Sequence, residues 1–394
     1  MRYNFDEYVE RRGSGSSKWD SQTGPFGAEG LLPFWVADSD FAVLPEIQQA
    51  MTERIKHPVF GYTVARESYY TAIQNWTKSR YGYETEKEWI VPGTGVMGSV
   101  AVAVQSLTQP GDKIIIQTPV YPPFHSVIST NGRELVKSEL KRDKNNYYTM
   151  DFEDLEQKIK DGAKMLLLCN PHNPVGRVWT KEEMARVIEL CNRYGIYLVS
   201  DEIHCDIIMP GHQLTSAMCF PSIYDRLVVC TAPSKTFNIA GLSVSNALIP
   251  GKETREKVQA QMAKNKAPSP NILSKLACEA AYTHGAQWVD EMNEYLQGNM
   301  DYVYNFCKEN MPDIPVTRPE GTYLIWVDFG VFGKSSGDII HFLVEQEKIG
   351  LGDGTPYSDT AGARGFIRLN AGCPMCTLKE GMDRLYHAYT LLEK

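Results

Sequence analysis

Long apolar runs are missing from this 394-residue sequence, and their absence excludes whole classes of protein. No apolar run approaches the length of about 18 residues that would suggest a membrane span. The opening residues, MRYNFDEYVERR, lack the apolar core of a signal peptide. We therefore expect a cytoplasmic protein without a membrane partner.

Positive charge is also in short supply. Lys and Arg number 40 against 48 Asp and Glu, which gives a formal net charge of −8. A protein that binds the phosphate backbone of nucleic acid needs a stripe of Lys and Arg to displace counterions, and the sequence has no such stripe. Nucleic acid is therefore not expected as a partner.

Cysteine does not form the pattern of a disulfide framework. The nine cysteines are odd in number and spread along the chain, which fits a reducing compartment where buried Cys acts as a small hydrophobe. Cys373 and Cys376 have CxxC spacing, but no second CxxC or His pair completes a metal site. We expect no metal.

What the sequence does contain is an alternation of strand and helix patterns between about residues 90 and 250. One helix is well signalled, because Thr180 and Glu183 form a capping box ahead of an apolar stripe. This alternation predicts an α/β fold with a parallel or largely parallel sheet covered on both faces. The strand-like runs are KIIIQ (113–117), MLLLC (165–169), IYLVS (196–200), LVVCT (227–231) and the weaker SNALI (245–249).

The sequence after about residue 285 changes character. A long amphipathic stretch leads into GTYLIWVDF and then GFIRLNAG near the end. We predict a large domain over residues 46–285 and a smaller C-terminal domain over 286–394. Residues 1–45 precede the first convincing helix of the large domain and are expected to join the small one.

Polar residues follow four of the predicted strands directly. Ligands of open α/β sheets bind outside the carboxyl ends of the strands, so these residues are expected to lie together. The four segments are TPVYPPF (118–124), NPHNPVGR (170–177), DEIH (201–204) and APSKTFN (232–238). They supply Tyr121, Asn173, Asp201 with His204, and Ser234 with Lys235.

Lys235 is the most informative of these residues. A lysine after a strand is normally a solvated surface charge, but small and apolar residues surround this one. Partial desolvation makes an amine more readily neutral and nucleophilic, and such an amine forms Schiff bases. Asp201, taken alone, has an ordinary alternative as a helix cap or turn residue.

A glycine-rich turn provides a candidate anion site. PGTGVMGSV (92–100) places glycines before a helix, where backbone N–H groups can approach an anion at the positive helix end. Such turns are common and, in isolation, are more often structural. Here the turn accompanies a lysine and a carboxylate at the expected strand ends.

Pyridoxal phosphate requires a lysine for its aldehyde, a carboxylate that keeps its ring nitrogen protonated, and an anion site for its phosphate. Lys235 and Asp201 would fill the first two roles. Asn173 can donate to the phenolic oxygen, and Tyr121 can stack on the ring. The phosphate would be held by Ser234 and by the N–H groups of Gly95 and Val96.

NPHNPVGR, SDEIH and PSKTFNIAGL, in this order, resemble the fold-type I pyridoxal phosphate enzymes of the aspartate aminotransferase superfamily. WVADSDF (35–41), FGYT (60–63) and GTYLIW (321–326) resemble its cysteine-sulfur β-lyase subgroup, the cystathionine β-lyases. The resemblance covers essentially the whole chain. It implies a mostly parallel seven-stranded sheet between helices, a smaller α/β domain from both termini, and a pyridoxal 5'-phosphate cofactor.

The same resemblance implies roles for individual residues. Lys235 would bond the cofactor, and we expect Lys235 and Tyr121 to be catalytic. Arg368, within GFIRLN, would clamp the α-carboxylate of an amino-acid substrate. Tyr62 would reach the cofactor phosphate of the neighbouring subunit, which makes the protein a homodimer.

Three positions depart from the wider superfamily. His204 stands where many aminotransferases have Tyr, Ser243 where many have Arg, and Ala232 where many have Ser. The first two fit the lyase subgroup, whereas Ala232 leaves part of the phosphate cradle undefined. His204 has two readings, a contact with the cofactor and a histidine that is simply packed below it.

The leading hypothesis is β-elimination from a cysteine-type amino acid such as cystathionine, giving a thiol, pyruvate and ammonia. A class I/II aminotransferase would use the same lysine and cofactor and is the alternative. A third interpretation is a regulatory binding protein. Residues 1–45 are too short for a DNA-binding domain, and the intact catalytic residues argue against a purely binding role.

Overall fold

A seven-stranded sheet forms the centre of the computed structural model, which describes residues 1–392. Its strand order is β2-β10-β9-β8-β7-β3-β4. Strand β10 runs antiparallel to both of its neighbours, and the other pairings are parallel. The strands are β2 (Ile90–Gly93), β3 (Lys113–Thr118), β4 (Glu134–Glu139), β7 (Ala163–Cys169), β8 (Tyr197–Asp201), β9 (Leu227–Thr231) and β10 (Ser245–Leu248).

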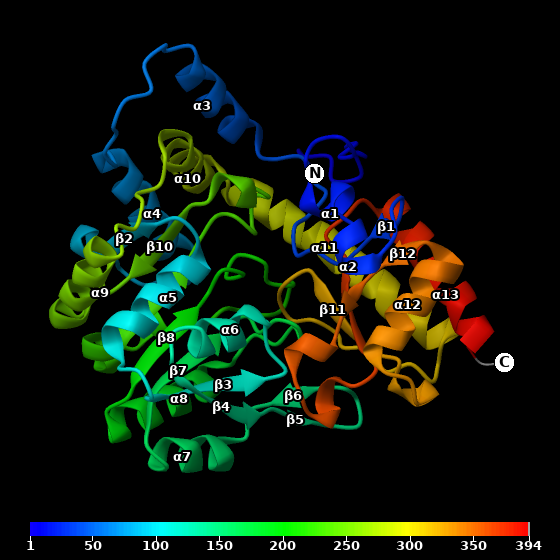
Figure 1. The fold of residues 1–394 in the computed structure, drawn as a ribbon. Helices are drawn as coiled ribbons and strands as arrows, with labels where there is room; N and C mark the ends of the chain where they lie inside the picture. The colour runs from blue at the N-terminus through cyan, green and yellow to red at the C-terminus, as the bar shows by residue number, and fades with distance from the viewer. Residues whose placement is uncertain (393–394) are drawn as a thin grey trace.

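Helices cover both faces of this sheet (Figure 1). Alternate residues of β7 show why both faces must be covered. Leu166 and Leu168 are buried in one hydrophobic core, whereas Met165 and Leu167 are buried in the other. The helices of this part are α3 (Pro45–Ile55), α4 (Glu67–Tyr81), α5 (Val96–Leu107), α6 (Pro123–Ser129), α7 (Phe152–Lys160), α8 (Lys181–Tyr194), α9 (Lys252–Lys264) and α10 (Ile272–His284).

Local signals begin and end these helices as the sequence predicts. The N–H of Glu183 donates to the side-chain oxygen of Thr180, and the N–H of Thr180 donates to the carboxylate of Glu183. Gly195 ends α8 in the left-handed conformation with φ 68°. The capping box and the expected strand runs are confirmed.

The two ends of the chain meet in a second group of elements, seen beside the large sheet in Figure 1. β1 (Leu32–Pro33) pairs in parallel with β12 (Ile349–Gly350), and β11 (Leu324–Asp328), β14 (Phe366–Asn370) and β13 (Gly352–Asp353) form a three-stranded sheet. These pairings support our proposal that residues 1–45 and 286–394 make the small domain. The helices here are α1 (Ser17–Asp20), α2 (Thr23–Phe26), α11 (Ala286–Asn310), α12 (Ser336–Glu347) and α13 (Met375–Leu392), and a separate hairpin joins β5 (Lys141–Arg142) and β6 (Tyr148–Thr149).

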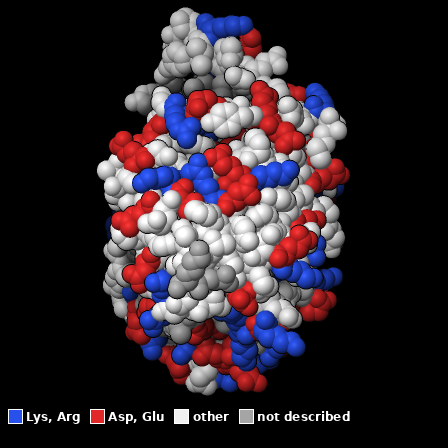
Figure 2. All heavy atoms as spheres, turned by 90° about the vertical axis from the view of Figure 1, so that its right-hand side faces the viewer, with Lys and Arg blue, Asp and Glu red and all other residues white. Residues whose placement is uncertain are grey.

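Charges of both signs are interspersed on the face drawn in Figure 2. Within residues 1–392, no helix is long and apolar enough to cross a membrane. All nine cysteines are free, and only Cys219 and Cys376 are exposed. Among the described residues no group of His, Cys, Asp and Glu could hold a metal ion.

Candidate active site

The carboxyl ends of β3, β7, β8 and β9 meet at one edge of the large sheet, because these four strands are parallel. Backbone hydrogen bonds join the loops that follow them. The N–H of Tyr121 donates to the carbonyl of Asn173 over 3.1 Å, and the N–H of Asn170 donates to that of Asp201 over 2.9 Å. The structure thus brings the strand-end residues together as predicted.

A cavity of about 640 Å³ lies beside these loops. Tyr121, Lys235 and Arg368 line it, and so do Trp35, Val36 and Ala37 from the N-terminal segment. Elements from both ends of the chain therefore close over the edge of the large sheet. Most of the other lining side chains are apolar, as in small-molecule sites generally.

Asp201 ends β8 and is 3% exposed. Burial raises the pKa of its carboxyl to about 7, against smaller opposing effects of the Ile203 N–H, which donates to Oδ1 over 3.0 Å, and of Lys235. A buried carboxylate with no cation in contact is costly. The site is therefore suited to a cationic group placed against Asp201.

Lys235 follows β9 in a turn and points toward the N-terminal segment. Its Nζ donates to the carbonyl of Ala37 over 2.6 Å. Burial lowers the pKa of the Lys235 amine, Arg368 lowers it further, and Asp38 and Asp201 oppose them. The desolvation expected from the sequence is present, and it favours the neutral, nucleophilic amine.

Arg368, on β14, is 5% exposed and has a free donor. Its Nη1 donates to Oδ1 of Asn173 over 3.2 Å, and its Nη2 donates to the carbonyl of Trp35 over 2.7 Å. Nε is buried without a hydrogen-bond partner. A buried guanidinium with no carboxylate in contact is suited to an anionic ligand.

His204 lies below these groups and is 3% exposed. Burial lowers the pKa of its imidazole to about 3, and Lys235 and Arg368 lower it further. Its ring stands edge to face with Tyr323 at 5.8 Å, and Nδ1 has no hydrogen-bond partner. The imidazole is therefore neutral, and its contact with a cofactor stays a prediction.

Gly95 caps the N-terminus of α5 with φ 126°, a conformation that side chains rarely adopt. Its N–H donates to Oγ of Ser245 over 3.1 Å, and the hydroxyls of Ser245 and Ser99 lie 3.2 Å apart. Val96 begins the helix and is buried. This helix end is suited to an anion, and Ser99 and Ser245 are polar side chains beside it that sequence reasoning missed.

Residues 35–39, here named the N-terminal strap, have no regular secondary structure but every one of their carbonyls accepts a side-chain hydrogen bond. The donors are Arg11, Lys18, Lys235, Tyr323, Arg368 and Asn370. Two predicted site residues, Lys235 and Arg368, are among them. The motifs WVADSDF and GTYLIW pointed to these segments, but no local pattern revealed their hydrogen bonds.

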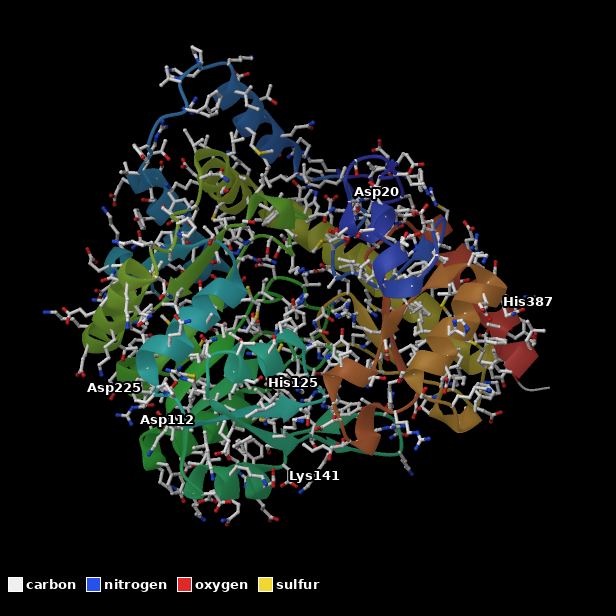
Figure 3. The ribbon with its side chains drawn as sticks, viewed as in Figure 1. Asp20, Asp112, His125, Lys141, Asp225 and His387 are labelled. Carbon is white, nitrogen blue, oxygen red and sulfur yellow. The ribbon has the colours of Figure 1, made fainter. Side chains whose placement is uncertain are left out.

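The segment 355–363 borders the cavity from the C-terminal side. The N–H of Val120 donates to the carbonyl of Tyr357 over 3.1 Å, Lys137 pairs with Asp359, and the Thr360 hydroxyl donates to Glu139. His125, on α6, is close enough to Lys137 and Asp359 to feel their charges. It is labelled in Figure 3. Tyr357 lines the cavity, and the centre of its ring lies 5.4 Å from the guanidinium carbon of Arg368. Tyr357 was not predicted from the sequence.

Several predicted site residues are not among those that line the cavity, namely Gly95, Val96, Asn173, Asp201, His204 and Ser234. Tyr62 is another. It lies between α3 and α4, is fully exposed, and does not line the cavity. Ile55, Val59, Phe60 and Val64 are exposed beside it in the sequence. Within residues 1–392 of a single chain, no contact places Tyr62 against the site.

The donor set fits pyridoxal phosphate. Lys235 offers an amine for the aldehyde, the buried Asp201 carboxyl suits a cationic ring nitrogen, and the Gly95 turn suits a phosphate. The Oδ1 of Asn173 accepts from Arg368, which leaves its N–H groups free to donate to a phenolic oxygen. Tyr121 lines the same cavity.

The chain is similar to known proteins over nearly its whole length. The family model described as aminotransferase class I and II matches residues 31–385. The chain is 40% identical over 384 residues to the cystathionine beta-lyase PatB of Bacillus subtilis, covering 97% of this chain and 98% of that protein.

Two solved structures are also similar. The PLP-bound putative aminotransferase of Clostridium difficile gives a TM-score of 0.95 at 39% identity, covering 98% of this chain and 100% of that one. The PLP-bound C-S lyase of Staphylococcus hominis gives 0.91 at 31% identity, covering 98% of each chain.

Proposed function

The chain belongs to the aminotransferase class I and II family, and from that premise we propose how its residues carry out a carbon–sulfur β-elimination. It is a pyridoxal-phosphate-dependent carbon–sulfur β-lyase, similar over its full length to a cystathionine beta-lyase and to a C-S lyase. When bound, the cofactor supplies an electron sink for negative charge that develops at the substrate Cα. The substrate class is a cysteine S-conjugate, with L-cystathionine as the first candidate.

The observation that carries the proposal is that Lys235 and Arg368 line one cavity, with Asn173 bonded to Arg368 and Asp201 close enough to act on the Lys235 amine. They come from β8, β14 and two loops; Asp201, Asn173 and Arg368 are buried, and Lys235 is partly buried. A carboxyl suited to a cation and a guanidinium suited to an anion both act on an amine whose pKa is lowered by burial.

Arg368 acts first in this account, because its unpartnered Nε and its Nη groups can hold the substrate carboxylate. The held amino acid then presents its Cα–H to the amine of Lys235, which takes the proton as a general base. The Cβ–S bond breaks, and the electron pair leaves with sulfur as a thiolate. The remaining three-carbon fragment is released and hydrolyses to pyruvate and ammonia.

Asn173 and Tyr121 orient the reacting system from two sides. The Asn173 amide, fixed by its bond to Arg368, would donate to the phenolic oxygen of the cofactor. Tyr121 lines the cavity and would cover one face of the ring. Gly95, Val96 and Ser234 would hold the phosphate, and His204 would contact the ring as a neutral group.

The test is incubation of the purified holoenzyme with L-cystathionine and no oxo acid. A lyase forms pyruvate and a free thiol in equal amounts over many turnovers. An aminotransferase would stop after a single turnover, because no oxo acid regenerates the cofactor. The Lys235→Ala variant should form neither product and should lose the visible absorbance band of the bound cofactor, and pyruvate formation by this variant would refute the role of the lysine.

Two further statements belong to the proposal. We propose a homodimer in which Tyr62 reaches the cofactor phosphate of the neighbouring subunit, supported by the exposed apolar side chains of Ile55, Val59, Phe60 and Val64 around it. We also propose a cytoplasmic location, supported by nine cysteines that are all free.

A further inference from the structure

Tyr323 shares a hydrogen-bond acceptor with Lys235. The Tyr323 hydroxyl donates to the carbonyl of Ala37 over 3.0 Å, and Nζ of Lys235 donates to the same oxygen over 2.6 Å. Burial raises the pKa of the Tyr323 hydroxyl, so that it remains protonated and keeps donating. The tyrosine therefore fixes the acceptor that the amine uses without being required to touch a substrate.

The chain reaches Tyr323 through a strained residue. Thr322 has φ 69°, in the left-handed region that a β-branched side chain seldom adopts. Its N–H donates to the carbonyl of Ile207 over 2.8 Å, and its hydroxyl accepts from the N–H of Leu324 over 3.1 Å. Backbone strain of this kind persists where the surroundings hold it and clusters at functional sites.

The Ala37 carbonyl constrains the direction of the amine. A carbonyl oxygen can only accept, so the lone pair of a neutral Lys235 amine must point away from Ala37. Besides burial, the charged groups that shift the pKa of this amine are Asp38 of the strap, Asp201 of β8 and Arg368 of β14. Burial, and after it the charge of Lys235, in turn lowers the pKa of the His204 imidazole. Tyr323 adds a neutral donor to the same acceptor.

We propose that Tyr323 is a positioning residue of the β-elimination, which holds the Ala37 carbonyl so that the Lys235 amine presents its lone pair to the Cα proton of the substrate. This inference rests on the proposed function of Lys235 as the base. Tyr323 acts through the strap, and its removal should therefore slow proton removal while cofactor and substrate binding persist.

The experiment uses holoenzyme of wild type and of Tyr323→Phe, with L-alanine in D₂O as the probe. Alanine has no β-leaving group, so exchange of its Cα hydrogen, followed by NMR, reports proton removal alone. Loss of one orienting hydrogen bond should slow exchange about tenfold while the visible absorbance of the bound cofactor and the KM for alanine change little. The pH at half-maximal exchange should rise, because the ammonium form gains more from an unshared acceptor.

A buried tyrosine outside the cavity provides the matched control. Tyr148, in β6, has a buried hydroxyl, and Tyr148→Phe should leave both the exchange rate and its pH profile unchanged. A Tyr323→Phe enzyme with the exchange rate and pH profile of wild type would overturn the proposal. A result in which alanine exchanges but cystathionine is not cleaved would count against the lyase function, and the comparison of exchange rates would still decide the role of Tyr323.

A second variant tests the proposal independently if Tyr323→Phe fails to fold. Ala37→Gly loosens the same carbonyl and keeps Tyr323, so it should slow exchange in the same direction. Both substitutions together should then cost less than the product of their separate effects, since they act through one oxygen. Fully multiplicative effects would show that Tyr323 acts by another route and would overturn the proposal.

Discussion

Arg368 donates through Nη1 to the side-chain oxygen of Asn173 over 3.2 Å, which joins the sheet at the end of the chain to the loop after β7. Two residues with separate predicted roles are thereby one hydrogen-bonded unit. The contact fixes which end of the Asn173 amide faces the cavity, and it orients the guanidinium whose Nε has no partner. With the roles proposed above, positioning of substrate and cofactor would be coupled at this point.

Arg368→Lys tests this unit. A lysine keeps the charge but loses the planar fork that can hold a carboxylate and Asn173 together. We expect kcat/KM for the amino-acid substrate to fall by about a hundredfold or more, chiefly through a higher KM. Steady-state kinetics with the holoenzyme measure this change. Arg384→Lys, at an exposed pair with Glu380 on α13, is the control and should leave kcat/KM unaltered.

Asp201→Asn tests the buried carboxyl through stability. Burial raises the folded-state pKa of Asp201 to about 7, above its ordinary value, so the folded protein without cofactor binds more protons than the unfolded chain between about pH 4 and pH 7. The stability contributed by this group is present at low pH and is lost as pH rises through the folded pKa. Asparagine does not titrate, yet its oxygen can still accept from the Ile203 N–H.

Cofactor-free Asp201→Asn should therefore be more stable than cofactor-free wild type at about pH 8, by on the order of 2–4 kcal/mol, and nearly equal to it at about pH 4. Urea unfolding at the two pH values measures the difference. Glu202, whose pKa burial also raises to about 7, is present in both proteins, and the charge of Asp201 is only the smallest cause of its shift. If the free energy of unfolding changed with pH by the same amount in the two proteins, a buried, protonated Asp201 would be contradicted. The same variant should be inactive, because asparagine cannot keep a ring nitrogen cationic.

Much of this site is predictable from sequence, since strand ends in a parallel sheet meet at one edge. The runs ending at Cys169, Ser200 and Thr231 located Asn173, Asp201 and Lys235 by that rule alone. The pKa of Lys235 is lowered by burial, as its small apolar neighbours predict. Arg368 was assigned by resemblance, and its buried Nε without a partner is the physical feature that supports the role.

The N-terminal strap was not predictable in this way. Its carbonyls are satisfied by side chains far along the chain, such as Asn370 and Lys235, and no local period or spacing encodes such pairs. Ser245 at the Gly95 turn is a similar case, because its contact arises from the antiparallel pairing of β10 with β2. Long-range polar contacts depend on the folded arrangement and leave no trace in hydrophobic patterning.

Asn370→Ala tests the strap. The Asn370 side chain is fully buried and donates to the carbonyls of Val36 and Asp38, each over 2.6 Å, so its removal leaves two buried acceptors with fewer donors. We expect a loss of about 2–4 kcal/mol in the free energy of unfolding and faster proteolysis within residues 35–39. Urea denaturation and limited proteolysis measure both. Asn310→Ala, which removes a donor at the end of α11, should have a much smaller effect.

The dimer proposal predicts that each active site is built from residues of two subunits. If Tyr62 serves the neighbouring site, each active site takes Lys235 from one subunit and Tyr62 from the other. Homodimers of Lys235→Ala should then be inactive, and homodimers of Tyr62→Ala should bind the cofactor phosphate weakly and turn over slowly. A mixed dimer contains one site with both wild-type residues.

Mixing the two variants under conditions that exchange subunits should therefore restore activity, to about a quarter of wild type in an equal mixture with random pairing. This fraction follows because half of the dimers are mixed, and each mixed dimer has one intact site of two. Pyruvate formation before and after exchange measures it, and an equal mixture of Lys235→Ala and wild type is the control, because its activity should stay at half of the wild-type value. If Tyr62 instead acted within its own subunit, mixed dimers would gain nothing over the sum of the separate variants, and the exposed Tyr62 would need another explanation.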